Sequence, residues 1–324
     1  MDKRTLGATG LEITTVGFGA WAVGGPDYAF GWGPQDDDES VGAIQRAVDS
    51  GINWIDTAAI YGLGHSERIV ARALKALGSS RRPYVFTKCS LRWKEDGSIY
   101  HSLEAASLKE EVENSLRRLE IETIDLYQIH WSRPFGSTER APDIEEGWQT
   151  LLDLRREGKV RHIGVSNFDT SEMERVAGRG PIGSLQPQYS LLSRRVEESI
   201  LPYCQAHNIG VIVYSPMAAG LLSGAMTRER AATLPSNDWR THNPLFQEPK
   251  LSGALALVEV LRGIGNQHGA SPGAVAVAWT LRHPAVTAAI VGFRRPTQVD
   301  GVVAAAGLRL SADEVREIEV HGAI

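Results

Sequence analysis

The sequence predicts a (β/α)8 TIM barrel, and three observations carry this prediction. Eight short β-rich runs alternate with longer helical patterns along the whole chain of 324 residues. Most of these runs lack strict alternation of apolar and polar residues, as expected for parallel strands buried on both faces. The length also fits one barrel of about 250 residues enlarged by an N-terminal hairpin and by long loops at the C-terminal mouth. We therefore expect a single domain spanning residues 1–324.

The elements follow one another in a regular order. Residues 4–6 and 11–13 predict a hairpin that turns at Ala8-Thr9-Gly10. The predicted strands are Val16–Ala20, Ile52–Asp56, Tyr84–Cys89, Ile124–His130, Val160–Ser166, Ser184–Tyr189, Val211–Ser215 and Ala288–Gly292. The predicted helices are Asp38–Ser50, Ser66–Leu77, Glu104–Leu119, Asp143–Glu157, Ser171–Ala177, Val196–His207, the long stretch Leu251–Arg282 and the terminal Ser311–His321.

Terminal signals support several of these helices. Gly51 and Gly78 follow the first two helical patterns, where glycine commonly ends a helix. Ser171, with Glu174 three residues later, matches a capping box and predicts where the fifth helix begins. Two segments, Gly24–Asp37 and Ala231–Lys250, carry no clear pattern. Such long loops in a compact domain are usually functional, and we expect Gly24–Asp37 at the barrel mouth.

Composition excludes several classes of function. The chain has 34 basic and 39 acidic residues, a net charge of −5, so no electrostatic footprint for nucleic acid or an anionic membrane is expected. The N-terminal sequence lacks the apolar run of a secretory signal, and Ile209–Leu222 is too short to cross a bilayer. Cys89 and Cys204 are widely spaced and predict no disulfide framework. We expect a cytoplasmic protein and, by default, a monomer.

Polar residues end consecutive predicted strands. These are Asp56, Lys88, His130 and Ser166-Asn167, and Tyr61 follows Asp56 by five residues. One such residue alone is more often a charge at a solvated strand end than a catalytic group. In a barrel, however, all the C-terminal strand ends open on one face, so four residues in register predict a shared site.

The set makes chemical sense as a proton-transfer site. A phenol with an ordinary pKa near ~10 transfers protons poorly at neutral pH, and a neighbouring cation lowers that pKa. We therefore expect Lys88, held by Asp56, to activate Tyr61 as a general acid, while His130 orients a bound carbonyl. Because none of these groups is a strong nucleophile, hydride from a cofactor is the natural partner.

The same residues resemble the aldo-keto reductase superfamily, in a bacterial-type branch similar to the potassium-channel β-subunit-like reductases. Asp56-Thr57-Ala58-Ala59-Ile60-Tyr61-Gly62 is similar to the signature around the family's catalytic Asp and Tyr. Phe86-Thr87-Lys88 and Tyr127-Gln128-Ile129-His130-Trp131 resemble the strands that carry its Lys and His. The resemblance implies catalytic roles for Asp56, Tyr61, Lys88 and His130 in the reduction of aldehydes or ketones.

The resemblance also implies a nicotinamide cofactor and its contacts. The positions that bind the nicotinamide carboxamide match Ser166, Asn167 and Gln186. Tyr214 matches the aromatic residue that stacks on the nicotinamide ring. An arginine at the position of Arg294 favours the 2′-phosphate and therefore NADPH over NADH. The full expected set is Gly19, Ala20, Trp21, Asp56, Ser166, Asn167, Gln186, Tyr214, Ser215, Pro216, Met217, Gly220, Leu221, Ser223, Gly292, Arg294 and Gln298.

Other signals are weaker. Gly17-Phe18-Gly19-Ala20-Trp21-Ala22 fits a dinucleotide fingerprint, but Gly24-Gly25-Pro26 cannot continue the helix that this motif must open, so we reject a Rossmann domain. The nine histidines form no metal-binding motif, and we expect no metal site. Aromatic residues near the strand ends predict a wall for an apolar or aromatic carbonyl substrate; they are Trp21, Tyr28, Trp32, Trp93 and Trp131.

Two other functions stay open at this point. The channel β-subunit branch has similar motifs, so a redox-sensing or regulatory subunit that binds cofactor and turns over slowly is the main alternative. A metal-dependent barrel hydrolase or sugar isomerase is a third. The physiological substrate, the direction of the reaction and the strictness of the NADPH preference do not follow from the sequence.

Overall fold

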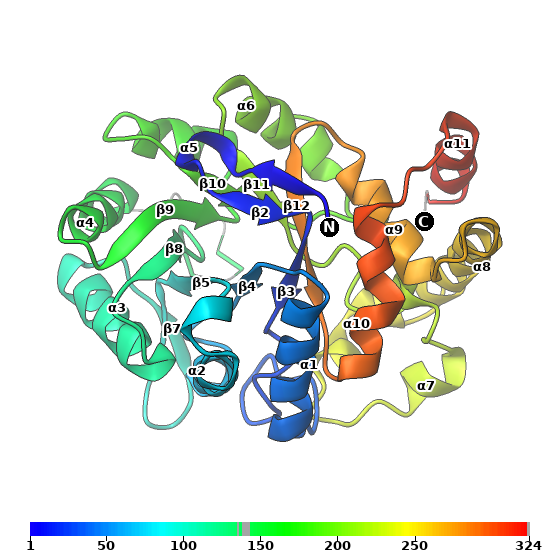
Figure 1. The fold of residues 1–324 in the computed structure, drawn as a ribbon, viewed down its shortest axis with the longest axis horizontal. Helices are drawn as coiled ribbons and strands as arrows, with labels where there is room; N and C mark the ends of the chain where they lie inside the picture. Colours follow the sequence, from blue (N-terminus) through cyan, green and yellow to red (C-terminus); the bar gives the residue numbers. More distant parts are fainter. Residues whose placement is uncertain (135, 138–142, 323–324) are drawn as a thin grey trace.

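Eight parallel strands form a closed barrel in a computed structural model, which describes residues 1–134, 136–137 and 143–322 (Figure 1). The barrel strands are β3 (Val16–Gly19), β4 (Trp54–Asp56), β5 (Tyr84–Cys89), β8 (Ile124–Ile129), β9 (Val160–Ser166), β10 (Ser184–Gln186), β11 (Gly210–Val213) and β12 (Val286–Gly292). They pair in sequence order, and β12 returns to β3. The eight predicted strands are confirmed, and Pro187, which lacks an N–H, follows the last residue of β10.

Helices surround the barrel in Figure 1. They are α1 (Asp37–Asp49), α2 (His65–Leu77), α3 (Ala105–Leu119), α4 (Ile144–Arg156), α5 (Thr170–Ala177), α6 (Ile200–Ala206), α7 (Arg228–Ala232), α8 (Lys250–His268), α9 (Pro272–Leu281), α10 (Pro296–Val303) and α11 (Ala312–His321). Their apolar faces and the outer faces of the strands form the main core, with Trp148 and Trp279 fully buried in it. This arrangement leaves the ends of the barrel to the loops and the hairpin.

The N-terminal hairpin closes one end of the barrel. Strands β1 (Lys3–Thr5) and β2 (Glu12–Thr14) are antiparallel, as predicted, with a short 3₁₀ turn between them. Leu6 and Ile13 are fully buried in a second core with Trp54, Phe86 and other barrel residues. Because this end is filled with apolar side chains, the opposite end, where the strands finish, is the one available for chemistry.

The structure differs from the sequence prediction at several elements. The long pattern Leu251–Arg282 is two helices, α8 and α9, divided at Gly269, which adopts a left-handed conformation (φ 63°). The predicted capping box of Ser171 and Glu174 is wrong, because Asp169 caps α5 and Glu172 closes the box. Asp169 with Glu172 fits the capping-box pattern as well as Ser171 with Glu174 does. The structure uses the earlier pair, and the helix that begins there buries Glu172 and Met173.

Three further pieces of structure had no prediction. Leu91–Trp93 (β6) and Ile99–His101 (β7) form a small antiparallel hairpin within the region after β5. Helix α10 follows Pro296 at its first turn. The segment Ala231–Lys250 contains the end of α7, two short 3₁₀ helices (Trp239–His242 and Pro244–Phe246) and the start of α8. It is therefore an ordered covering segment rather than a featureless loop.

Candidate active site

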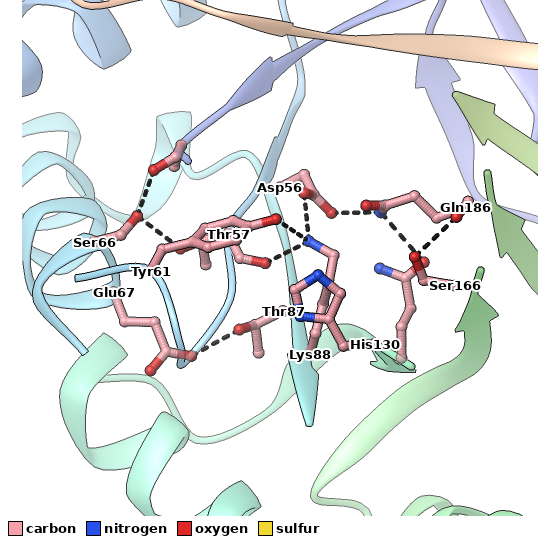
Figure 2. Close-up of polar contacts among 12 residues, drawn as sticks. Asp56, Thr57, Tyr61, Ser66, Glu67, Thr87, Lys88, His130, Ser166 and Gln186 are labelled. Carbon is pink, nitrogen blue, oxygen red and sulfur yellow. Dashed lines mark hydrogen bonds and ion pairs between the residues drawn. The ribbon is translucent and has the colours of Figure 1, made fainter. Parts of the chain in front are cut away.

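The barrel brings the four predicted catalytic residues together. Asp56 ends β4, Lys88 lies in β5, His130 follows β8, and Tyr61 lies in the turn between β4 and α2. In Figure 2 their side chains point toward one another around the ammonium group of Lys88. The rings of Tyr61 and His130 are 5.8 Å apart between centroids and nearly perpendicular. Residues from three strand ends thus form one cluster.

Lys88 is the centre of this cluster. Its Nζ donates to Asp56 Oδ2 at 2.6 Å, to the backbone oxygen of Thr57 at 2.8 Å and to the Tyr61 hydroxyl at 3.4 Å. The side chains of Lys88 and Asp56 are 0% and 3% exposed. Three acceptors match the three N–H groups of an ammonium ion, so the pair is ionic and compensated within the protein.

Burial sets the protonation states of Tyr61 and His130. It raises the pKa of the Tyr61 phenol well above its ordinary value, and the Asp56 carboxylate acts in the same direction. This differs from the expectation that Lys88 lowers the Tyr61 pKa, because burial dominates and Asp56 compensates the nearby ammonium charge. Burial, assisted by Lys88, lowers the pKa of His130 well below its ordinary value. Tyr61 is therefore a protonated phenol and His130 a neutral imidazole at neutral pH.

A second set of polar groups continues from Asp56 across the barrel. Gln186 Nε2 donates to Asp56 Oδ1 at 2.8 Å, and Ser166 Oγ donates to the Gln186 backbone oxygen at 2.8 Å (Figure 2). Asn167 donates to the His130 backbone oxygen at 3.1 Å and accepts the Tyr214 hydroxyl at 2.9 Å. These bonds fix the side chains expected to contact nicotinamide and connect them to the cluster around Lys88.

The turn that carries Tyr61 is anchored from α2. Ser66 Oγ donates to the Ala20 backbone oxygen at 2.8 Å and lies 2.9 Å from Thr57 Oγ1. Glu67 is fully buried, accepts from Thr87 at 2.7 Å and pairs with Arg118 at 2.6 Å. Since Thr87 and Thr57 flank Lys88 and Asp56 in sequence, these bonds hold the backbone on both sides of the ion pair.

A cavity of about 900 Å³ opens above this cluster at the C-terminal end of the barrel. The predicted residues that line it are Gly19, Trp21, Tyr28, Trp32, Asp56, Tyr61, His130, Trp131, Asn167, Gln186, Tyr214, Ser215, Pro216, Met217, Gly220, Ser223, Gly292, Arg294 and Gln298. Five predicted residues lie outside the lining: Ala20, Lys88, Ser166, Leu221 and Trp93. The first four are buried beside it, whereas the Trp93 ring packs against the Arg118 guanidinium at 5.6 Å.

The cavity fits an elongated cofactor. A methyl group added at Gly220 or Gly292 would meet nothing nearer than 3.9 Å, so these two glycines leave open space along the lining. At the end of the cavity away from Tyr61, the Arg294 guanidinium donates to Gln35 Oε1 at 2.5 Å and to the Pro34 backbone oxygen. The backbone N–H of Arg294 donates to Gln298 Oε1 at 2.7 Å. Burial and the neighbouring Arg240 lower the pKa of Arg294. The Arg294 guanidinium therefore places a positive charge at this end of the cavity, which matches an anionic part of a ligand.

Some lining residues had no prediction. Trp239 and Arg240 come from the segment after α7, and Ile99, Tyr100 and His101 come from strand β7. The dipeptide Asp96-Gly97 between alternating apolar residues was a hairpin signal for the second group. No local pattern marks Trp239, because its position depends on two loops that meet only in the folded chain.

The described residues contain no cluster of three or more His, Cys, Asp or Glu side chains arranged to hold a metal ion. None of the helices described here is long and apolar enough to span a bilayer.

Fold and cluster together define an oxidoreductase of the barrel type that uses a nicotinamide cofactor, NADH or NADPH. The model of the aldo/keto reductase family matches residues 15–323, and the chain belongs to this family. It is 37% identical over 319 residues to aldo-keto reductase YhdN of Bacillus subtilis (strain 168), covering 98% of this chain and 92% of that protein. It is 34% identical over 323 residues to the NADH-specific methylglyoxal reductase of Escherichia coli (strain K12), covering 96% and 95% of the two chains.

Solved structures give the same result. The glycerol dehydrogenase AKR11B4 from Gluconobacter oxydans superimposes with a TM-score of 0.86 at 37% identity, covering 99% of this chain and 94% of that one. The aldo-keto reductase AKR11C1 from Bacillus halodurans in its holo form gives a TM-score of 0.78 at 29% identity, covering 99% and 96%. The (β/α)8 barrel fold and the reductase class predicted from the sequence are confirmed.

Proposed function

We propose that this chain reduces aldehydes or ketones to alcohols with NADPH, and that Tyr61 supplies the proton. The observation that supports this most directly is the contact of the Tyr61 hydroxyl, at 3.4 Å, with a lysine ammonium that also binds Asp56. When bound, the cofactor supplies a hydride to the carbonyl carbon. The residues of the chain hold the carbonyl oxygen, exclude water and deliver the proton.

Tyr61 and His130 divide the work at the carbonyl oxygen. Because burial keeps the Tyr61 phenol protonated, it donates a hydrogen bond to the oxygen and then its proton as negative charge develops there. The ammonium of Lys88 stabilises the resulting phenolate through their direct contact. The neutral imidazole of His130 offers a hydrogen bond without competing as an acid.

The nicotinamide ring would be held by Gln186, Asn167 and Tyr214. The 2′-phosphate would bind to Arg294. A planar guanidinium matches the oxygens of a phosphate, which supports NADPH over NADH. The E. coli relative is named as NADH-specific, so a similar chain can prefer NADH. Arg294 would therefore set the preference for NADPH in this chain.

The test is NADPH consumption over a panel of carbonyl compounds, with NADH in parallel and alcohol product measured by chromatography. Steady turnover of at least one aldehyde or ketone with NADPH supports the proposal. A burst of one equivalent of NADPH per protein, followed by very slow turnover, would instead support the alternative of a cofactor-binding regulatory subunit. The single-domain organisation, the monomeric state and the cytoplasmic location stay predictions, and sedimentation velocity tests the second.

A further inference from the structure

Two loops that are far apart in sequence are joined over the cavity. The segment Gly24–Asp37 follows β3, and residues 233–249 follow α7. The backbone N–H of Trp239 donates to the Gly31 backbone oxygen at 3.0 Å, and Trp32 forms a β-bridge with Asp238. The Arg240 guanidinium lies 4.7 Å from the centre of the Trp32 ring. The two loops therefore meet as one covering layer.

A buried ion pair fixes this junction. Asp238 accepts from Arg240 Nη2 at 2.6 Å and from Arg240 Nε at 2.9 Å, a bidentate contact, and the two side chains are 1% and 7% exposed. The same carboxylate accepts the Arg240 backbone N–H at 3.0 Å. Because Asp238 and Arg240 flank Trp239, their pairing sets the backbone from which that indole projects.

Trp239 belongs to a stack of aromatic rings that reaches the catalytic cluster. Its ring lies 5.1 Å from the Trp21 ring with planes 22° apart, and the Trp21 ring lies 6.1 Å from the Tyr61 ring with planes 25° apart. Trp32 meets both Trp21 and Trp239 edge-on, at 5.1 and 5.7 Å. All four rings line the cavity. Trp239 thus extends the aromatic surface beside Tyr61 with a further flat ring.

We propose that Trp239 is a specificity-determining residue that selects carbonyl compounds with a flat, conjugated body over small aliphatic ones. A rigid indole face offers stacking area at little entropic cost, and the joined loops hold that face in place before substrate arrives. Small aliphatic aldehydes need only the groups around the reacting oxygen and gain little from this face. The inference rests on the proposed function and names the substrate class of the same site.

The experiment measures kcat/KM for 2-naphthaldehyde and for propanal at saturating NADPH. The variants are Trp239→Ala, Trp239→Leu and Trp239→Phe, with Trp93→Phe as the matched control because Trp93 lies outside the cavity lining. We expect the naphthaldehyde-to-propanal ratio to fall about tenfold or more in the Ala and Leu variants. The ratio stays within about threefold of the parent in Trp239→Phe, which keeps a flat ring at this position, and in Trp93→Phe, which leaves Trp239 unchanged.

An unchanged ratio in both the Ala and Leu variants overturns the proposal, including the case in which both aldehydes lose rate equally. The Leu variant keeps apolar bulk and serves where the Ala variant fails to fold. A second readout requires no turnover: calorimetric affinity for the unreactive 2-naphthamide falls in the Ala and Leu variants and not in Trp93→Phe. If the parent protein reduces neither aldehyde, this affinity still decides the role of Trp239. The proposed function fails only if no aldehyde or ketone of the full panel is reduced.

Discussion

Replacing Glu111 by glutamine tests how the structure holds the segment that follows Lys88. Glu111 lies in α3, is 5% exposed, accepts the backbone N–H of Ser90 at 3.0 Å and accepts the Ser107 hydroxyl at 3.2 Å. Ser90 adopts a left-handed conformation (φ 79°) and its hydroxyl contacts the Trp131 backbone at 3.1 and 3.2 Å. Glu111 therefore supports both the start of the β6–β7 hairpin and a wall of the cavity.

Burial raises the pKa of Glu111 from 4.5 to about 7, with Arg92 opposing this rise. The folded state then binds the proton more tightly than the unfolded state does. This contribution to stability is fully present below about pH 4.5 and is lost as the pH rises through 7. The two pKa values differ by about 2.5, and a pKa difference of one corresponds to about 1.36 kcal/mol. The pH-dependent contribution of Glu111 to the free energy of unfolding is therefore at most about 3 kcal/mol.

Glu111→Gln keeps an acceptor for Ser90 and carries no charge, so it lacks this pH dependence. We expect the free energy of unfolding of the variant, relative to the parent, to rise by up to about 3 kcal/mol between pH 5 and 8. Urea unfolding followed by fluorescence measures it. Glu110→Gln is the control, because the Glu110 side chain is 58% exposed. A difference between parent and Glu111→Gln that stays constant from pH 5 to 8 would refute the reasoning.

Three other predictions concern charge at and around the cavity. The rate of reduction stays constant from about pH 6 to 9, because the raised Tyr61 pKa and the lowered His130 pKa both lie outside this range. A step in the rate near pH 6.5 would contradict a neutral His130. Arg294→Gln weakens NADPH binding about tenfold to a hundredfold and leaves NADH binding unchanged, as fluorescence titration will show. Asp238→Asn lowers the free energy of unfolding by about 3 kcal/mol, because it leaves Arg240 buried without its partner. Asp300→Asn, at an exposed pair with Arg46, lowers it by less than about 1 kcal/mol. Equal losses in the two variants would contradict a stabilising role of the buried pair.

The barrel and the convergence of the four proposed catalytic residues were predictable because their signals are local. Each strand is a short β-rich run, and Asp56, Lys88 and His130 stand at or near the ends of three such runs. Parallel strands in a closed barrel then bring these ends together whatever the loops do. Tyr61 was predicted with them because it follows Asp56 by five residues and because its phenol can supply a proton.

The rest depends on contacts that no local pattern encodes. Trp239 reaches the cavity only because Asp238 and Arg240 pair and because the loop carrying Trp32 lies against them. Trp93 has the same chemistry, yet it turns toward Arg118 and leaves the cavity lining. The direction of the Tyr61 pKa shift also differs from the expectation, because the sequence does not show how completely the phenol is buried.

The central claim is that Tyr61 donates the proton during carbonyl reduction. It is tested most directly by measuring NADPH-dependent turnover and NADPH affinity of Tyr61→Phe beside Trp93→Phe. We predict that turnover falls by about 10²–10⁴-fold in Tyr61→Phe, the range expected for loss of a general acid, while NADPH affinity stays close to that of the parent. Near-normal reduction by Tyr61→Phe would contradict the account.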